Sequence, residues 1–297
     1  EDERRSKEAC SYRVITRQFS SLGEYNFELG KMRIRKSIDS ANLLKIYEIS
    51  EDSAAKRFEL RVEELPSNDF DTELRTEELF EVFLGALNAI SDLHAIQRMH
   101  GDIRPERIHY NRAFKRTVLL DCLEDSLPWL ERQKAHFTQA RPLYLPPWVF
   151  DELCAGKSQI HVSPFKLDQF FLAMTLLQRL SGQTPSIYDR ATGRFLHAEI
   201  DRICREAERG LDKAGEKLLS FIEKRLLVGS ERETLSAKEC LTALGGLRTA
   251  LFPQRPSRPS LPFPRLSPRS RSDSGETAED SAFSQCLGDI TPYDFSE

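Results

Sequence analysis

Three charged side chains in one short stretch of the sequence could do chemistry. Asp102, in the run His100-Gly101-Asp102, carries a carboxylate that could act as a general base. Asp121 follows the apolar run Val118-Leu119-Leu120 and could bind magnesium, which normally takes two or more ligands together with substrate phosphates. Arg107 lies between them and cannot ligate a metal, because a guanidinium has donors but no acceptor. We therefore expect Arg107 to pair with Asp102 or Asp121, or else to point into solvent.

The surrounding stretches predict the elements that must position these residues. Phe58, Leu60 and Val62 alternate with charged residues, which is the period of a half-buried strand. From Thr76, the expected N-cap, apolar residues recur at helical spacing as far as Leu93. The predicted strands span residues 12–15, 42–49, 57–63 and 117–120, and the predicted helices span about 23–37, 76–93, 167–180, 212–227 and 236–250.

This order of elements predicts an α+β chain with a β-rich part at 1–65 and a mainly helical part at 66–252. The composition changes at 253–297, where arginines come first, acidic residues follow, and a periodic apolar face is missing. We expect that tail to be disordered, either as a plain linker or as a ligand for aromatic-grooved domains. Its first prolines recur every third residue, as on one face of a polyproline II helix, at Pro253, Pro256, Pro259 and Pro262.

The overall composition suits a soluble globular protein. The chain has 297 residues, is 39% hydrophobic and 30% charged, and has a net charge of −4, so nothing general indicates a nucleic-acid partner. No apolar run reaches the roughly 18 residues that a membrane helix needs. The sequence starts at Glu1, which suggests a processed or trimmed product. Its six histidines and six cysteines form no recognisable metal motif, so the cysteines are expected to be buried thiols, or disulfides in an oxidising compartment.

The stretch from His100 to Asp121 resembles the catalytic centre of a protein kinase. In that family an H-R-D-x-x-x-x-N loop supplies a base and an amide ligand, and a D-F-G turn supplies a second metal-binding carboxylate. Here Asp102 and Asp121 are present, but Arg107 stands at the amide position and Cys122 and Leu123 replace the Phe-Gly pair. The resemblance therefore implies a kinase fold that has lost kinase chemistry.

The resemblance extends over the rest of residues 10–250. Asp168 matches the buried residue that opens the central helix and anchors the catalytic-loop backbone, and His100 is expected to be structural as well. Tyr144-Leu145-Pro146-Pro147-Trp148 matches the Y-x-A-P-E region with Trp148 in place of the acid. The segment from Arg232 to Leu241 resembles the R-x-T-A-x-x-x-L pattern near the last helix.

The same resemblance implies a reduced small lobe. Kinases cover the ATP phosphates with a Gly-rich loop and pair a strand Lys with a helix Glu. This sequence contains no G-x-G-x-x-G, and only about a dozen residues precede the first strand. Arg13 stands at the place expected for the Lys, with Glu28 as its first candidate partner and Glu24 as its second. Val62 falls near the gatekeeper position.

Within the superfamily, the chain looks most like the secreted, rhoptry-type kinases of apicomplexan parasites. Their with-no-Gly-loop branch lacks the same loop and includes degenerate members, such as a bradyzoite pseudokinase associated with the vacuole and cyst wall. This resemblance implies secretion into a parasitophorous vacuole or cyst wall. Without it, the sequence indicates only a soluble protein.

Two classes of function follow. The first is a catalytically inactive pseudokinase that binds or scaffolds protein partners, has no cofactor, and keeps Asp102 and Asp121 as structural residues. The alternative is an active serine/threonine-type protein kinase that uses ATP and magnesium through those two carboxylates. A variant of the alternative is a small-molecule phosphotransferase, because that group often spells the loop H-G-D.

Overall fold

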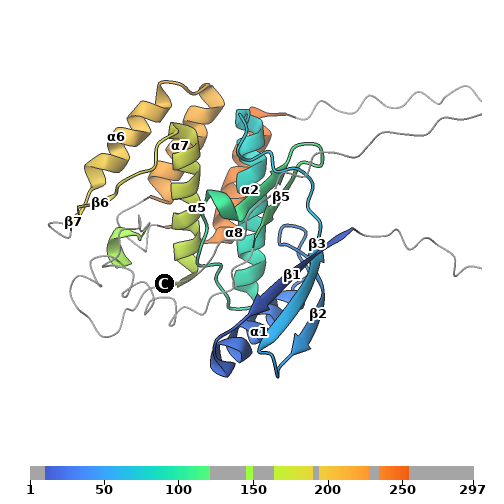
Figure 1. Ribbon diagram of the computed structural model, residues 1–297. Helices are drawn as coiled ribbons and strands as arrows, with labels where there is room; N and C mark the ends of the chain where they lie inside the picture. The colour runs from blue at the N-terminus through green and yellow to red at the C-terminus, as the bar shows by residue number, and fades with distance from the viewer. Residues whose placement is uncertain (1–10, 121–144, 150–163, 190–193, 228–233, 254–297) are drawn as a thin grey trace, which may run out of the picture. The chain divides into compact units, whose positions relative to one another are not determined.

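The computed structural model describes residues 11–120, 145–149, 164–189, 194–227 and 234–253 (Figure 1). Its strands are β1 (Tyr12–Gln18), β2 (Ile46–Asp52), β3 (Arg57–Glu63), β4 (Ile108–Asn111), β5 (Arg116–Leu119), β6 (Tyr188–Asp189) and β7 (Arg194–Phe195). Its helices are α1 (Leu22–Lys36), α2 (Thr76–Ala95), the 3-10 turn η1 (Pro105–Arg107), α5 (Pro164–Ser181), α6 (His197–Glu208), α7 (Lys213–Arg225) and α8 (Ala237–Leu251). The α+β class expected from the sequence is confirmed, with a small β-rich part and a larger helical part.

The β-rich part is a three-stranded antiparallel sheet in the order β1-β3-β2, with α1 packed on one face (Figure 1). The alternation of β3 puts its apolar residues on the inner face, where they meet the apolar side of α1. Helix α1 begins with a capping box between Ser21 and Glu24, which satisfies backbone donors at its first turn. The core so formed contains Tyr25, Leu29, Met32, Phe58, Leu60 and Val62, among others.

The helical part is built around α2 and α5, whose inward side chains are almost completely buried. Helix α2 packs against α8, α5, α7 and β5. At Gly85 it approaches β5 so closely that an added Cβ would lie 2.6 Å from the Thr117 Cβ, so only glycine fits there. Helix α5 is apolar nearly all round, as the sequence predicted, because neighbouring helices enclose it.

Backbone hydrogen bonds join the two parts at strand β5. The Leu119 N–H donates to the Asn42 carbonyl at 2.8 Å, and the Leu44 N–H donates to the Leu119 carbonyl at 3.3 Å. The Arg116 guanidinium forms an ion pair with Glu63, at the end of β3, at 2.8 Å. Strand β5 is therefore held both by its own hairpin partner β4 and by the segment that leads into β2.

Two expectations about local structure were wrong, and some elements were not predicted. The strand predicted at 42–49 begins only at Ile46, because residues 42–44 turn aside to bond β5. Thr76 is not the N-cap of α2: Arg75 holds that position, and the Thr76 hydroxyl donates to Asp212 at 2.9 Å. Helix α6 was not predicted at all.

The expectations about the cysteines and the tail can be compared with the structure only in part. Cys204 and Cys240 are free, buried thiols, and burial raises the pKa of each to about 12. The other four cysteines and the tail after Pro253 lie outside the described residues. Within the described ranges, none of the helices combines the length and apolar character needed to span a bilayer.

Candidate functional site

The candidate site is the loop between α2 and β4, and its backbone is held by one buried carboxylate. Asp168, in the first turns of α5, is completely buried. Its Oδ2 accepts the His100 N–H at 2.8 Å, and its Oδ1 accepts the Gly101 N–H at 2.8 Å. The His94 ring also contacts Oδ2 at 3.0 Å through Nε2. Gly101 has a φ of 78°, a left-handed conformation that favours glycine.

The imidazole of His100 ties the loop to the strand that follows. Its Nδ1 accepts the Asp102 N–H at 3.3 Å, so the neutral ring can donate from Nε2 to the Leu120 carbonyl at 3.1 Å. Burial lowers the pKa of His100 below its usual value, which keeps the ring neutral. The Leu120 N–H in turn donates to the Arg107 carbonyl at 2.8 Å. The loop is therefore fixed from both sides.

Both carboxylate oxygens of Asp102 face guanidinium groups. Arg107 Nε donates to Oδ2 at 3.1 Å, and Arg104 Nε forms an ion pair with Oδ1 at 3.3 Å. The side chains of Arg107 and Asp102 are 30% and 36% exposed, so the pair lies at the surface of the loop and is not enclosed. The sequence allowed two partners for Arg107. The structure shows the pair with Asp102, and Asp121 lies outside the described residues.

The described residues do not fit a magnesium site. In the sequence resemblance Arg107 stands at the amide position of the kinase loop, and a guanidinium repels a cation. Within the described part of the chain there is no group of three His, Cys, Asp or Glu side chains that could hold a metal. Cys122, Leu123, Tyr144 and Arg232, which carried parts of the family resemblance, also lie outside the described residues.

In the small lobe, the structure does not bring Arg13 to Glu28. Glu28 forms ion pairs with Arg17 at 3.6 Å and with Lys31 at 3.0 Å. Arg13 is exposed on β1, directly opposite the buried Val62 of β3.

The second candidate partner of Arg13 has a local role instead. Glu24 accepts hydrogen bonds from the Ser20 hydroxyl at 2.8 Å and from the Ser21 N–H at 3.4 Å. The hydrogen bond from Ser20 is the main reason that the pKa of Glu24 is lowered. On the face that α1 turns to the sheet, apolar side chains stand where an acid would be needed, namely Tyr25, Leu29 and Met32.

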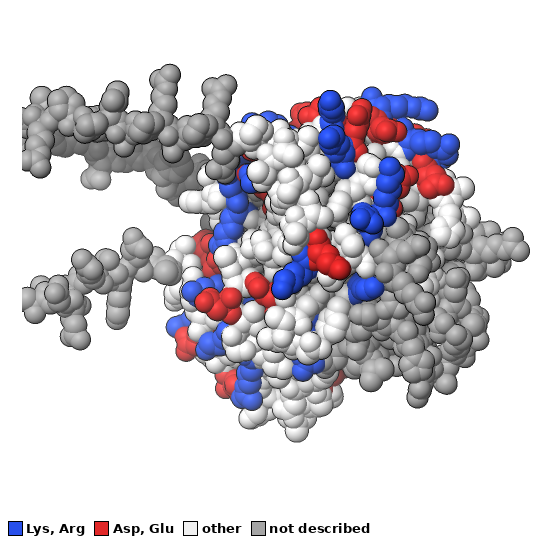
Figure 2. All heavy atoms as spheres, turned by 180° about the vertical axis from the view of Figure 1, so that it is seen from behind, with Lys and Arg blue, Asp and Glu red and all other residues white. Residues whose placement is uncertain are grey.

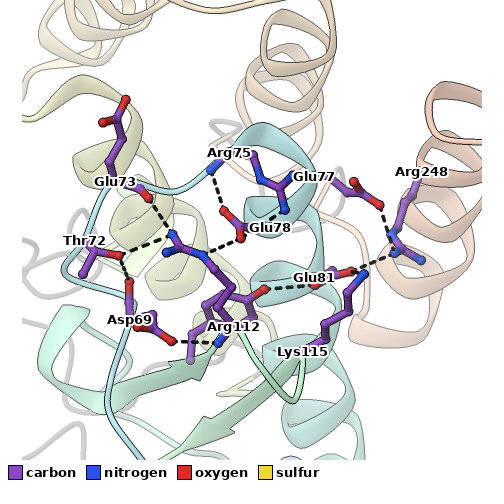
Figure 3. A network of polar contacts seen from close by, with 11 residues as sticks. Asp69, Thr72, Glu73, Arg75, Glu77, Glu78, Glu81, Arg112, Lys115 and Arg248 are labelled. Carbon is purple, nitrogen blue, oxygen red and sulfur yellow. Dashed lines mark hydrogen bonds and ion pairs between the residues drawn. The ribbon is translucent and has the colours of Figure 1, made fainter.

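Sequence reasoning missed a polar network that joins the β4–β5 hairpin to the first turns of α2 (Figure 3). Glu78, in the first turn of α2, is buried and accepts from Arg112 Nε at 2.6 Å and from the Arg75 N–H at 2.8 Å. Burial works against ionisation of Glu78, but these two donors keep its pKa below the usual value. In the sequence, Glu78 is recognisable only as an acid near the start of a predicted helix, where the positive end of the helix dipole favours it. Nothing in the sequence indicated that Glu78 would be buried, because Arg112, the cation that pairs with it, lies 34 residues later.

A second acid in the same network joins three elements. Glu81 of α2 accepts from the Tyr110 hydroxyl at 3.0 Å and from Arg248 of α8 at 3.0 Å, and it pairs with Lys115 at 3.5 Å (Figure 3). Burial, and then the Glu81 hydrogen bond, raise the pKa of Tyr110. The β4–β5 hairpin, which continues directly from the loop, is thus fastened to α2 and α8.

Charge is mixed over the visible surface. On the face in Figure 2, cationic and acidic side chains of the described residues lie interspersed, and neither sign forms a continuous field. Trp148, which the sequence resemblance matched to an acidic residue of kinases, packs edge-on against Phe170 of α5 with ring centroids 5.9 Å apart. That position therefore contributes to the core packing of the helical part.

Comparisons with known proteins show which solved structures have a similar fold. No protein-family model and no curated protein matches the chain. The autoinhibited serine kinase domain of the giant muscle protein titin matches with a TM-score of 0.58 and 20% identity, over 78% of this chain and 70% of that chain. Rad53 residues 1–466 in complex with AMP-PNP match with a TM-score of 0.53 and 15% identity, over 77% and 56% respectively. These likenesses show an α+β, protein-kinase-like fold with a small β lobe and a larger helical lobe.

Proposed function

We propose that this chain, which has a protein-kinase-like fold, is a catalytically inactive pseudokinase that acts as a binding or scaffold protein. The observation that carries the proposal is the engagement of both Asp102 oxygens by Arg107 and Arg104. A kinase base must accept a proton from a substrate hydroxyl held beside a metal-bound nucleotide. Here two guanidiniums, which stay charged at any ordinary pH, lie against that carboxylate.

The small lobe supports the same proposal independently. Nucleotide-binding kinases place a Lys–Glu pair against the phosphates. Here Glu28 pairs with Arg17 and Lys31, while Arg13 remains exposed. The described groups thus lack the arrangement that would hold the phosphates, in addition to the arrangement that would hold the metal.

What the chain keeps is the architecture of the loop and not its chemistry. Asp168 and His100 still order the loop backbone, which suits a fold retained as a rigid surface for a protein partner. We also propose, from the sequence resemblance alone, that the chain belongs to the secreted, rhoptry-type branch and works in a parasite vacuole or cyst wall, without a nucleic-acid partner.

One observation favours the alternative of an active phosphotransferase. The same ordered loop holds Asp102 in a fixed place, and the His100–Leu120 hydrogen bond fixes the residue just before Asp121. An enzyme of this kind would use ATP and magnesium through Asp102 and Asp121, with Arg107 swung away from its present partner.

A thermal-shift titration separates the two functions. The full chain is titrated with ATP in the presence of magnesium or manganese, because a ligand that binds only the folded state raises its melting temperature with concentration. We expect no shift and no radiolabelled phosphate transfer to generic protein substrates. The Arg107→Asn variant, which restores the amide, is the matched comparison and should gain at most weak metal affinity. Phosphate transfer that disappears in Asp102→Ala would overturn the proposal.

A further inference from the structure

Strand β1 is the edge of the small sheet in the described part of the chain. It pairs with β3 along its whole length of seven residues and with no other described strand. An edge strand of this length presents a row of backbone donors and acceptors that another chain can use as a template. Native proteins usually cover or shorten such an edge, so this one calls for an explanation.

Two hydrogen bonds at the ends of β1 show which of its backbone groups face away from β3. The Ser11 carbonyl accepts from the Glu64 N–H at 3.2 Å, and the Phe19 N–H donates to the Lys56 carbonyl at 3.0 Å. In an antiparallel pair, alternate residues bond the same neighbour, so the odd-numbered residues of β1 bond β3. The residues whose N–H and C=O groups face the open edge are therefore Tyr12, Val14, Thr16 and Gln18.

The side chains along this edge differ between the two faces of the sheet. On the outer face, Tyr12 and Val14 are 52% and 48% exposed, and the Arg61 guanidinium lies over the Tyr12 ring, 5.3 Å from its centroid. On the inner face, Arg13 and Arg17 provide two cations. Arg13 is exposed and opposite an apolar residue of β3, while Arg17 has Glu28 as a partner. The strand itself contains no acidic residue.

This pattern favours a partner strand that alternates apolar and acidic residues. Cross-strand neighbours on one face interact directly, so apolar side chains would cover Tyr12 and Val14 while acids would face Arg13. A second copy of the chain fits less well. In the antiparallel register that pairs all seven residues, Ile15 lies opposite Ile15 of the other copy and Arg13 lies opposite Arg17, which places like charges together.

We propose that β1 accepts an extended acidic segment of a partner protein as an additional strand of the small sheet. Main-chain hydrogen bonds at the even-numbered residues would supply affinity, and the alternating side chains would supply specificity. The inference adds a binding surface and a class of partner to the proposed function. It rests on that function only in assuming that the chain binds another protein.

The test uses fluorescence anisotropy with the full chain and a labelled peptide as long as β1 that alternates valine and glutamate. A matched peptide carries lysine in place of glutamate. In the Val14→Pro variant the only backbone donor removed faces the open edge, so pairing with β3 and the melting temperature should change little. Val14→Thr keeps that donor and is the control. A peptide N-methylated on its protein-facing donors makes the same test without altering the protein.

We expect the glutamate peptide to bind, and Val14→Pro or N-methylation to weaken binding by roughly tenfold, the scale of one main-chain hydrogen bond. Val14→Thr should bind as the unmodified chain does, and Arg13→Glu should reverse the preference toward the lysine peptide. Equal binding by the Val14→Pro variant and by the N-methylated peptide would overturn the inference. So would a lack of peptide binding, or a dimer in light scattering that Val14→Pro abolishes.

The ATP titration on the same preparation keeps the two proposals distinguishable. Absence of peptide binding without a nucleotide response overturns this inference and leaves the pseudokinase proposal in place. Peptide binding together with phosphate transfer supports this inference and overturns the pseudokinase proposal.

Discussion

Replacing Asp168 by asparagine tests whether one buried carboxylate orders the whole loop. In the folded protein its two oxygens accept the backbone N–H groups of His100 and Gly101, both at 2.8 Å. An amide has one oxygen, so either orientation of the asparagine turns an NH₂ group toward one of these donors. One hydrogen bond to a charged acceptor is lost and one buried N–H is left unsatisfied. We expect Asp168→Asn to lower the free energy of unfolding by about 2–4 kcal/mol.

For a folded part of this size, that loss corresponds to a melting temperature lower by roughly 4–16 °C. Urea unfolding followed by tryptophan fluorescence gives the free energy of unfolding. Of the two tryptophans, Trp148 packs on Phe170, two residues from the substituted position. Asp201→Asn, at an exposed position of α6, is the matched control and should change stability by less than about 0.5 kcal/mol. Equal stability of the two variants would refute the role given to Asp168.

Three further predictions concern the loop and the polar network between α2 and the β4–β5 hairpin. Arg107→Ala should cost less than about 1 kcal/mol in urea unfolding, because the pair with Asp102 is about one third exposed; a larger loss would show that the pair is enclosed. Arg112→Ala should cost about 1–3 kcal/mol, because Glu78 is buried, and it should raise the Glu78 pKa so that stability is lost at a higher pH during acid titration. His100 has a lowered pKa, so the unfolded chain binds its proton first as the pH falls below about 6.5, and stability should decline there. His100→Gln should show a smaller decline, and an equal one would contradict this.

The fold was predictable wherever one periodic pattern covered a whole element. The strict alternation of β3 and the wide apolar face of α2 gave both elements nearly to their ends. Helix α6 was missed although Ile200, Ile203, Cys204 and Ala207 recur at helical spacing and are buried. This spacing is hard to recognise in the sequence, because charged residues fill most of the positions between the apolar ones. The segment at 42–45 has strand-like composition, and only a distant partner, Leu119, decides its conformation.

The candidate site was predictable in its sequence positions but not in its pairings. The loop motif indicated where Asp102 and Arg107 would lie, yet it left two acidic partners open for the arginine. The network around Glu78 could not be found, because its shorter ion pair joins Arg112, 34 residues later in the chain, and because burial of a single acid leaves no periodic trace. The Arg13–Glu28 assignment rested on the family resemblance. In the structure Glu28 pairs instead with Arg17 of β1 and with Lys31, three residues further along α1.

The bonds at Leu119 have a thermodynamic consequence for the whole folded part. This residue uses its N–H toward Asn42 and its carbonyl toward Leu44, while Arg116 beside it holds Glu63 of β3. Separating the sheet from the helices would break all of these contacts at once, so the two cores should unfold in a single cooperative transition. A strand that binds at β1 would then raise the unfolding temperature of distant helices as well. Binding at the sheet edge would therefore stabilise the helical core as well as the sheet, and this coupling needs no nucleotide.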